Sequence, residues 1–387
     1  MNAKSTIPIS ASSDSSSATL SGLQSLDITD YRNIGSARLA FCGGLNLITG
    51  VNAAGKTSLL EAIHCLGRAR SFRSTNADRQ IREGQSAFRL VGRVVMEAGR
   101  SLPIGIERRD GNYTIHAAGE PIRRLSNLAG NFPVHIMTGD TATVLNGGPR
   151  YRRQSLDWAL FHVEHGYRQT WQRYARSLRQ RNAALRERVP AKQVSVWDHE
   201  LVEVGGLLDR IRRHYLAELA PVIAEEVNSL LADKTFSLRY QSGWARDLSM
   251  QEALAKSLES DQSQGYTHVG PHRADFSLFL DDKPAMTHFS RGQQKALSVA
   301  FLLAQVKLQH VRGKPGGAFL LDDIASELDA EHQARVLAAL AELGTQVFVT
   351  AIDAGSLDIG AWAEQKRFHV EHGVIAEPVQ RTKTNPA

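Results

Sequence analysis

The sequence has 387 residues, enough for one large domain or two to three smaller ones, and its 42% hydrophobic residues can bury a core. Its formal net charge of +6 favours a polyanionic partner. The two cysteines, Cys42 and Cys65, exclude a disulfide framework, and every apolar run is shorter than the roughly 18 residues that cross a bilayer, so we expect a soluble cytoplasmic protein.

The N-terminal segment, residues 1–22, is rich in serine and poor in apolar residues, which is typical of a disordered leader. A secretory signal is not expected, because Lys4 is the one basic residue and no apolar segment follows it. Ordered structure should begin with a strand from Leu23 to Tyr31.

The stretch from Gly50 to Thr57 reads Gly-Val-Asn-Ala-Ala-Gly-Lys-Thr and lies between a strand-like apolar run and a helical segment. A loop of this spacing between a strand and a helix is the phosphate-binding P-loop, and the matching flanks disfavour a chance glycine-rich turn. Lys56 would place its charge on the β and γ phosphate oxygens, and the Thr57 hydroxyl would bind Mg²⁺. The remaining loop residues, whose backbone would surround the phosphates, are Gly50, Val51, Asn52, Ala53, Ala54 and Gly55.

Three arginines, Arg68, Arg70 and Arg73, surround Phe72 shortly after the P-loop. Such a patch could hold a DNA backbone by charge and counterion release. A solvated surface explains the same residues equally well, so both interpretations stay open. Beyond this patch, alternating runs at 88–96, 102–107 and 113–116 predict an antiparallel meander, and 134–137 predicts one more buried strand.

A helical arm is predicted after Gly147-Gly148-Pro149, where the composition changes. One helix would run from Arg150 to Val189, and two more would occupy about 194–219 and 221–232, because apolar residues recur at three- and four-residue spacing. On the first helix this stripe consists of Trp171, Ala175, Leu178, Asn182 and Leu185. The many arginines of the arm favour a solvated face over a binding surface.

The segment from Thr267 to Asp275 contains a Gly270-Pro271 turn with His272 and Arg273 beside it. A zinc site at His268 and His272 is set aside, because no further ligands lie nearby. Strands are expected around this segment at 236–240, 276–280 and 286–289.

Two further patterns bear on phosphate and metal chemistry. The helix from Lys295 to Leu308 is apolar almost all round, so it should be buried, and Ser290 would cap it with free N–H groups facing a phosphate. The apolar run from Ala318 to Leu321 predicts a buried parallel strand, after which Asp322 would hold Mg²⁺ and Asp323 would orient or deprotonate the attacking water. A helix at 330–343, a strand at 346–350 and a strand pair at 367–375 complete the predicted elements.

The order of the P-loop, Ser290-x-Gly292-Gln293, Asp322-Asp323 and Ser326-Glu327-Leu328-Asp329 resembles that of ABC-type ATPase heads. Four ordered motifs resemble more closely those of the RecF family of bacterial recombination-repair ATPases. They are Asn46 to Ile63 around the P-loop, Gly147-Gly148-Pro149-x-x-Arg152-Arg153-x-x-Leu156-Asp157, Gly270-Pro271-His272-Arg273 and Ser290-x-Gly292-Gln293-Gln294. The resemblance spans roughly residues 23–375. It implies an α/β, ABC-type (SMC-like) head with mixed and antiparallel sheets and an inserted α-helical arm.

The resemblance also implies how the parts would work. ATP and Mg²⁺ would lie between the heads of an ATP-dependent homodimer, with catalytic Lys56 and Asp323 on one head and signature contacts on the other, from Ser290, Gly292, Gln293 and Asp329. RecF-like proteins are slow ATPases that bind DNA at gaps and single-strand/double-strand junctions and work with RecR and RecO to help RecA replace single-strand-binding protein. The expected divisions are a leader (1–22), an ATPase lobe (23–146), an arm (147–265), a second ATPase part (266–377) and a tail (378–387).

The sequence departs from this family pattern at Ala53 and Ala274, where glycine and an acid are usual. A Cβ at residue 53 would cost about 1–2 kcal/mol if the backbone there needs a positive φ. Two alternative functions are an ATPase subunit of a membrane transporter and a mainly structural DNA scaffold with ATP as a ligand. The arm and the lack of a switch histidine near Thr350 disfavour the transporter.

Overall fold

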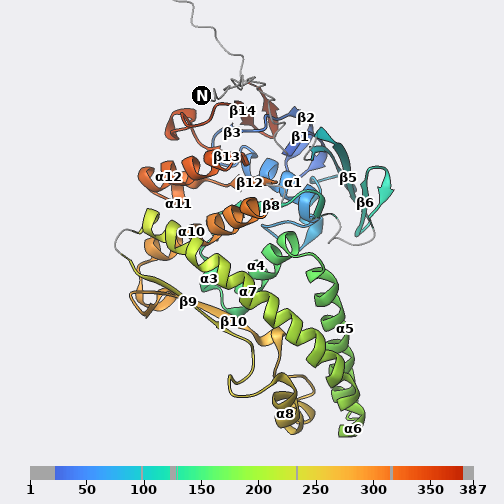
Figure 1. Ribbon diagram of the computed structural model, residues 1–387. Coiled ribbons are helices and arrows are strands. Elements are labelled where there is room, and N and C mark those ends of the chain that lie inside the picture. Colours follow the sequence, from blue (N-terminus) through green and yellow to red (C-terminus); the bar gives the residue numbers. More distant parts are fainter. Residues whose placement is uncertain are drawn as a thin grey trace, which may run out of the picture.

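The computed structural model describes residues 22–96, 99–122, 128, 130–231, 234–313 and 317–377. Apart from Gly22, the predicted leader and tail lie outside this part of the chain. Figure 1 shows an upper lobe built from sheets and covering helices, from which a group of long helices extends downward as an arm. This arrangement agrees with the predicted α/β class of mixed and antiparallel sheets with a helical arm.

The N-terminal strands form an antiparallel sheet with the order β2-β1-β4-β5-β6-β7. The predicted first strand and the predicted meander are both present in it, because alternate residues of these strands are buried as the period of a strand requires. The strands are β1 (Gly22–Tyr31), β2 (Ile34–Ala40), β4 (Ala87–Val95), β5 (Ser101–Arg109), β6 (Asn112–Ala117) and β7 (Glu120–Pro121).

A second sheet has the order β15-β14-β3-β13-β12-β8, and its pairs are parallel except for β14 with β15. It contains the strand that enters the P-loop and the strand that ends in the two aspartates. Its members are β3 (Leu45–Thr49), β8 (Val134–Met137), β12 (Ala318–Leu321), β13 (Gln346–Ala351), β14 (Gln365–Glu371) and β15 (Val374–Ala376).

The second sheet divides the interior into two hydrophobic cores, because alternate side chains point to opposite faces. On β12, Ala318 and Leu320 pack into the core shared with the antiparallel sheet and helix α1 (Lys56–Arg68). Phe319 and Leu321 pack into the core shared with α10 (Arg291–Val311) and the arm. The continuous apolar strand predicted at this position is therefore buried on both faces.

The arm differs from its prediction at two points. The expected single helix at 150–189 is two helices, because Gly166 takes a left-handed conformation (φ 84°) between α4 (Pro149–Val163) and α5 (Tyr167–Arg186). The two helices expected at 194–219 and 221–232 are instead one, α7 (Asp198–Leu230), with Pro221 inside it.

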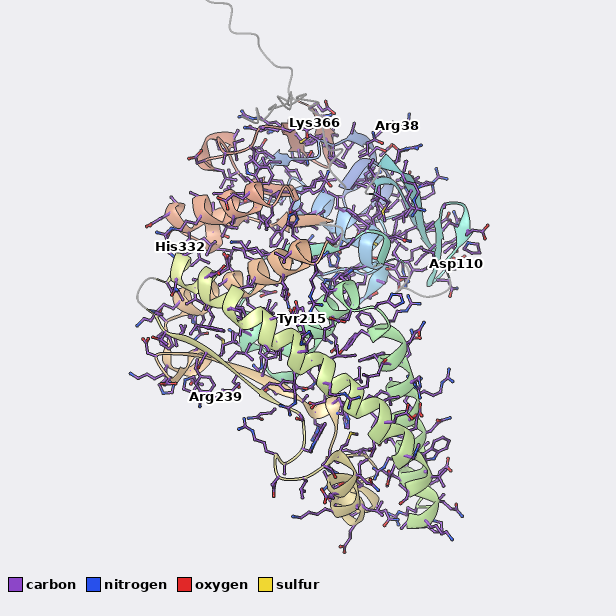
Figure 2. The ribbon with its side chains drawn as sticks, viewed as in Figure 1. Arg38, Asp110, Tyr215, Arg239, His332 and Lys366 are labelled. Atoms are coloured by element: carbon purple, nitrogen blue, oxygen red, sulfur yellow. The ribbon has the colours of Figure 1, made fainter. Side chains whose placement is uncertain are left out.

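The continuity of α7 through Pro221 has a packing reason. The missing N–H of a proline costs a helix one hydrogen bond, and the ring crowds the preceding turn. Leu216, Leu219, Ile223 and Val227 are nevertheless all buried in one core, so the apolar stripe continues in helical register across the proline. Tyr215 of the same helix lies at the junction of the arm and the head, where Arg312 packs over its ring (Figure 2).

A small antiparallel sheet, β11-β10-β9, lies beside α7 (Figure 1). The predicted strands at 236–240 and 276–280 are β9 (Phe236–Gln241) and β10 (Asp275–Leu280). The predicted strand at 286–289 is wrong, since β11 (Lys283–Pro284) is followed by a helical turn, α9 (Ala285–His288). The sequence analysis also missed helix α8 (Met250–Gln264), which begins with a capping box formed by Ser249 and Glu252.

The remaining elements are short or lie in the head. The predicted helix at 330–343 is α12 (Ala330–Glu342). None of the described helices combines the length and apolarity needed to traverse a lipid bilayer. The short helices and 3₁₀ turns are α3 (Thr143–Asn146), α6 (Ala191–Val194), α11 (Ile324–Glu327), η1 (Ala77–Gln80), η3 (Ser195–Trp197), η4 (Pro271–Arg273) and η5 (Ala354–Ser356).

Candidate nucleotide site

The P-loop connects β3 to α1 with the backbone that phosphate binding requires. Gly50 (φ 150°) could not carry a side chain, since a Cβ would lie 2.3 Å from the Val370 carbonyl oxygen. Gly55 (φ 122°) precedes the first residue of α1, so the free N–H groups of that helix open toward the loop. Ala53 has φ 64°, the left-handed conformation that makes alanine unfavourable at this position.

Lys56 lies at the centre of this loop. Its Nζ atom donates to the carbonyl oxygens of Gly50 at 2.7 Å and Val51 at 3.0 Å. These carbonyls hold the ammonium group inside the loop, where the backbone N–H groups would place a phosphate. The charge is thus set in place by the loop itself and needs no other side chain.

Thr57 of α1 and Asp322, the residue after β12, are joined by a hydrogen bond. The Thr57 hydroxyl donates to Asp322 Oδ1 at 3.1 Å, and the Thr350 hydroxyl donates to the same oxygen at 3.0 Å. Burial raises the pKa of Asp322, and the neighbouring charge of Asp323 raises it further. A hydroxyl and a carboxylate at this separation form the oxygen donor set that Mg²⁺ takes in nucleotide sites.

Asp323 is held in an unusual backbone conformation beside this pair. Its φ is 51°, and its N–H donates to the Thr350 hydroxyl at 2.7 Å. Aspartate tolerates this left-handed conformation, and the contact with Thr350 fixes it directly after β12. Thr350 therefore connects both aspartates, a role the sequence analysis did not assign. It could have been suspected from its place at the end of β13, next to β12.

A cavity of about 1040 Å³ opens in front of these residues. Lys56 and four arginines line this cavity together with the carboxylates of Glu83, Asp322 and Asp323. The cations outnumber the carboxylates, so the charge of the cavity suits a triphosphate. The arginines are Arg32, Arg73, Arg79 and Arg82. The sequence analysis did not connect any of them with the nucleotide, because they belong to other elements.

The fully buried Glu61 of α1 positions two of these arginines. Arg32 donates to both of its oxygens, at 2.8 and 2.6 Å, and the Arg73 guanidinium lies 3.8 Å from one of them. The Ser71 hydroxyl donates to the same carboxylate at 2.5 Å. Because Glu61 is tied to the helix of the P-loop, it sets the arginines against the phosphate side of the cavity.

The three arginines predicted as a DNA patch lie in three different environments. Arg68 is covered by Trp158, with its guanidinium 3.3 Å from the ring centroid, and it donates to the Val134 carbonyl oxygen. Arg73 lines the nucleotide cavity, and Arg70 is exposed. Arg68 therefore does not share one exposed patch with the other two, because it turns inward, whereas a DNA contact by Arg70 and Arg73 stays a prediction.

The signature segment lies at the start of α10 and outside the nucleotide cavity. Ser290 caps this helix as predicted: its hydroxyl accepts from the Gln293 N–H, while the Gln293 side chain accepts from the Ser290 N–H. Ser290 and Gly292 are exposed, and neither they nor Gln293 line the cavity. Asp329 caps α12, accepts from the His332 N–H and is also exposed.

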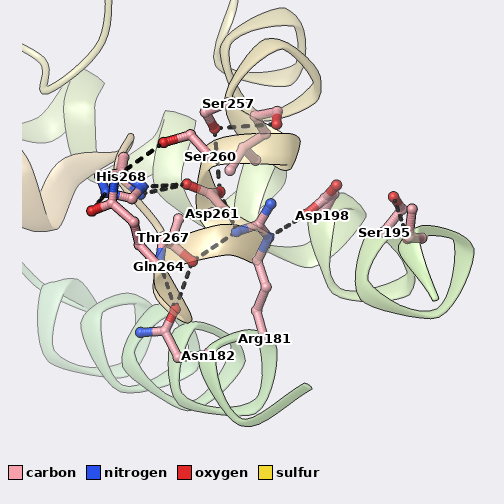
Figure 3. Close-up of polar contacts among 12 residues, drawn as sticks. Arg181, Asn182, Ser195, Asp198, Ser257, Ser260, Asp261, Gln264, Thr267 and His268 are labelled. Carbon is pink, nitrogen blue, oxygen red and sulfur yellow. Dashed lines mark hydrogen bonds and ion pairs between the residues drawn. The ribbon is translucent and has the colours of Figure 1, made fainter. Parts of the chain in front are cut away.

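The two histidines that were set aside as zinc ligands have other partners. His268 Nδ1 lies 2.7 Å from Asp261 Oδ1 (Figure 3), and His272 Nδ1 lies 2.7 Å from the Tyr174 hydroxyl. Within the described ranges, no three histidine, cysteine or acidic side chains gather in a way that could hold a metal ion.

Similarity to known proteins extends over most of the chain. Residues 22–374 match the family model of the RecF/RecN/SMC N-terminal domain. The DNA replication and repair protein RecF of Thioalkalivibrio sulfidiphilus is 39% identical over 355 residues, covering 91% of this chain and 98% of the relative. The chain belongs to the RecF family. RecF of Stutzerimonas stutzeri is similarly close, with 38% identity over 360 residues, 92% of this chain and 97% of that protein.

The fold is also similar to that of solved structures. It is similar to the solved structure of the recombination mediator protein RecF with ATP in the RecFOR pathway, with a TM-score of 0.84, 24% identity and coverage of 94% of this chain and 100% of that one. It is also similar to an Smc head domain from Pyrococcus furiosus bound to the C-terminal domain of ScpA, with a TM-score of 0.59, 15% identity and coverage of 92% and 95%. These findings confirm the predicted RecF family and SMC-like head and do not support the transporter alternative.

Proposed function

We propose that this RecF-family protein is an ATP-dependent DNA-binding ATPase of recombinational repair and replication, in which two chains close over shared nucleotide. The observation that carries the proposal is the separation of two half-sites. Lys56, Asp322 and Asp323 face one cavity, whereas Ser290 lies exposed at the start of α10 and outside that cavity. A second chain would complete each cavity with its own Ser290.

Within one cavity the residues have distinct roles in the proposed reaction. Lys56 and the loop N–H groups would bind and orient the phosphates, while Arg73 would add positive charge from the same cavity. Thr57 and Asp322 would hold Mg²⁺, which supplies charge neutralisation on the phosphate oxygens. Asp323 would orient the attacking water and accept its proton, with its backbone fixed by Thr350.

Complementation between two defective variants tests the shared site. Lys56→Ala removes the phosphate-binding cation, and Ser290→Arg places a bulky charge on the signature. Each variant alone should lack ATP-induced dimers, but a mixture should regain some, because a mixed dimer has one intact composite site. Sedimentation velocity of the two variants, separately and mixed with ATP, measures this. Full dimerisation by Ser290→Arg alone would overturn the proposed closure.

DNA binding is tested by salt titration on gapped, duplex and single-stranded DNA, with and without ATP. The slope of log affinity against log salt reports the number of phosphate contacts. We expect ATP to tighten binding to gapped DNA. If ATP leaves the affinity for all three unchanged, the ATP-gated function is wrong. Assembly with RecR and RecO follows from the family resemblance and is part of the proposal.

The scaffold alternative differs in one measurable respect, which is the use of hydrolysis. The Asp323→Asn variant should bind ATP but hydrolyse it slowly, so its dimer and its DNA complex should persist after excess nucleotide is removed. A scaffold would instead lose DNA at the same rate in the wild type and in this variant. The lifetime of the DNA complex in a competitor chase distinguishes the two.

A further inference from the structure

A second cavity, of about 190 Å³, lies in the arm, away from the nucleotide site. It is walled by one face of α4, one face of α5, Arg212 of α7 and His272 of η4. Its α4 residues are Arg150, Arg153, Gln154 and Asp157, and its α5 residues are Trp171, Tyr174, Ala175 and Leu178. Both sets have the three- and four-residue spacing that places side chains on one helical face.

Two motifs that the nucleotide site does not use come together at this cavity. Arg152 forms a bidentate pair with Asp275, with distances of 2.8 and 2.7 Å, and Arg153 donates to the Ala274 carbonyl oxygen at 2.7 Å. Arg212 donates to the Pro271 carbonyl oxygen at 2.7 Å. These contacts fix the Gly270-Pro271-His272-Arg273 turn against the start of α4, so the cavity is preformed.

The charges at this cavity do not balance. Asp157 Oδ1 already accepts from Arg212 at 2.7 and 3.2 Å and from the Tyr167 hydroxyl at 2.5 Å. In the described part of the chain, Arg150 and Arg153 have no carboxylate within ion-pair distance. The cavity therefore carries excess positive charge, and an anion would relieve it.

The α5 wall of the cavity is mainly apolar. Trp171 is 38% exposed, packs edge-on against Phe161 with ring centroids 6.4 Å apart, and continues into Ala175 and Leu178 on the same face of α5. Burial lowers the pKa of His272 to about 4, so this side chain is uncharged at neutral pH. A planar apolar group would thus be accepted between Trp171 and the neutral His272 end of the cavity.

We propose that this arm cavity binds one unstacked nucleotide of single-stranded DNA, with the base against Trp171 and the phosphate between Arg150 and Arg153. In a nucleotide the phosphate can pair with the arginines of one wall while the planar base contacts the apolar residues of the other. Proteins commonly bind single strands by stacking the bases on aromatic side chains. Bases in a duplex are stacked inside it and cannot enter. The inference rests on the proposed DNA-binding function and adds the site that would select single-stranded segments.

The test uses the full chain with ATP and measures anisotropy of labelled oligothymidylate and of a duplex of equal length. Trp171→Ala should weaken oligothymidylate binding about 5- to 150-fold, and Trp171→Phe should restore most of it, because an aromatic ring is retained. Arg150→Gln should lower the salt slope on the single strand by about 0.7, the loss of one phosphate contact. Duplex affinity should not change in any of these variants.

Arg179→Gln is the matched control, because it removes the same charge from an exposed position of α5 outside the cavity. Unchanged single-strand binding by Trp171→Ala, or an equal loss on single strand and duplex, would overturn the inference while the proposed function stands. Failure of the wild type to bind any DNA would instead overturn the proposed function. Binding of thymidine monophosphate that depends on Trp171, without binding of oligothymidylate, would assign the cavity to free nucleotides and overturn its assignment to DNA.

Discussion

The nucleotide cavity and the core of the arm use charged residues in opposite ways. Around the nucleotide cavity, Lys56 is held by backbone carbonyls, so its charge stays available to a ligand. In the arm, the fully buried Arg181 donates to Asp198 at 2.8 Å, to Asp261 at 2.6 Å and to Thr267 at 2.8 Å (Figure 3). In the residues that the structure describes, the charge of Lys56 is therefore not neutralised by a carboxylate and can bind a substrate. The charge of Arg181 is neutralised by carboxylates, and these ion pairs join α5, α7 and α8.

The difference teaches which variants should affect stability and which should affect binding. A buried charge that loses its partner is left in a medium that cannot solvate it, whereas a charge facing a cavity remains hydrated. Variants in the arm core should therefore change the free energy of unfolding, and variants in the nucleotide cavity should change ligand affinity. Each prediction below can break or sharpen this division.

The largest effect is expected from Arg181→Met, which leaves Asp261 buried with His268 as its one possible counter-ion among the described residues. We expect the free energy of unfolding to fall by about 3–5 kcal/mol. Urea unfolding followed by circular dichroism measures this. The matched control is Arg173→Met on the same helix, whose pairs with Glu200 and Glu203 are exposed to solvent, so its loss should change the free energy of unfolding far less. Equal losses in both variants would contradict the division.

Lys56→Ala should act on the ligand and leave the fold intact. The loss of charged hydrogen bonds to phosphate should cost about 1.5–3 kcal/mol, equivalent to ATP binding roughly 10- to 150-fold weaker. Titration calorimetry with Mg-ATP measures the affinity, and urea unfolding checks the stability. Lys366→Ala serves as control, since this lysine pairs with Glu377 outside the cavity. If Lys56→Ala lost much stability but bound ATP normally, Lys56 would be a residue of the fold and not of the ligand site.

The third prediction concerns the pH dependence of the free energy of unfolding, to which the histidines His135 and His162 contribute. Burial, together with the neighbouring positive charge of Arg68, lowers the pKa of His135 to about 4 and that of His162 to about 3. At a pH between the ordinary histidine pKa of about 6.5 and these lowered pKa values, both histidines are protonated in the unfolded chain but stay neutral in the folded chain. Each histidine therefore contributes stability above pH 6.5 that is lost as the pH falls, by at most about 1.4 kcal/mol per pH unit.

His162→Phe tests this acid sensitivity. Within the described residues, His162 Nε2 has no hydrogen-bond partner, so phenylalanine removes the titration without removing such a bond. The free energy of unfolding, measured from pH 7 to pH 4, should fall less steeply with acid in the variant than in the wild type. Parallel curves would show that His162 does not titrate on unfolding in this range.

The smallest effect is expected at Ala53, whose φ of 64° disfavours a Cβ. Ala53→Gly should raise the free energy of unfolding by about 0.5–1 kcal/mol, because relief of strain exceeds the added flexibility of glycine. Ala54→Gly is the control in the same loop, since Ala54 is not among the residues with positive φ, and it should lose a similar amount. Thermal unfolding of both variants decides the sign.

Prediction from the sequence succeeded where local structure depends on neighbouring residues. The P-loop is one contiguous segment in which the glycines shape the backbone and Lys56 and Thr57 follow directly in sequence, and Ser290 with Gln293 forms a cap within one turn. It failed where a role depends on distant residues. Arg73 reaches the cavity through Glu61, and Thr350 joins both aspartates from the next strand.

The sequence by itself determined the strand periods, the P-loop, the capped buried helix and the aspartates after β12, because these follow from local backbone hydrogen bonding and from which side chains avoid water. Only the tertiary structure decided that Arg68 turns inward under Trp158, that α7 continues through Pro221, and that the two arm motifs enclose a cavity. Those outcomes depend on which surfaces pack together. The energy of a buried charge or of a helical proline is set by neighbours that lie far away along the chain.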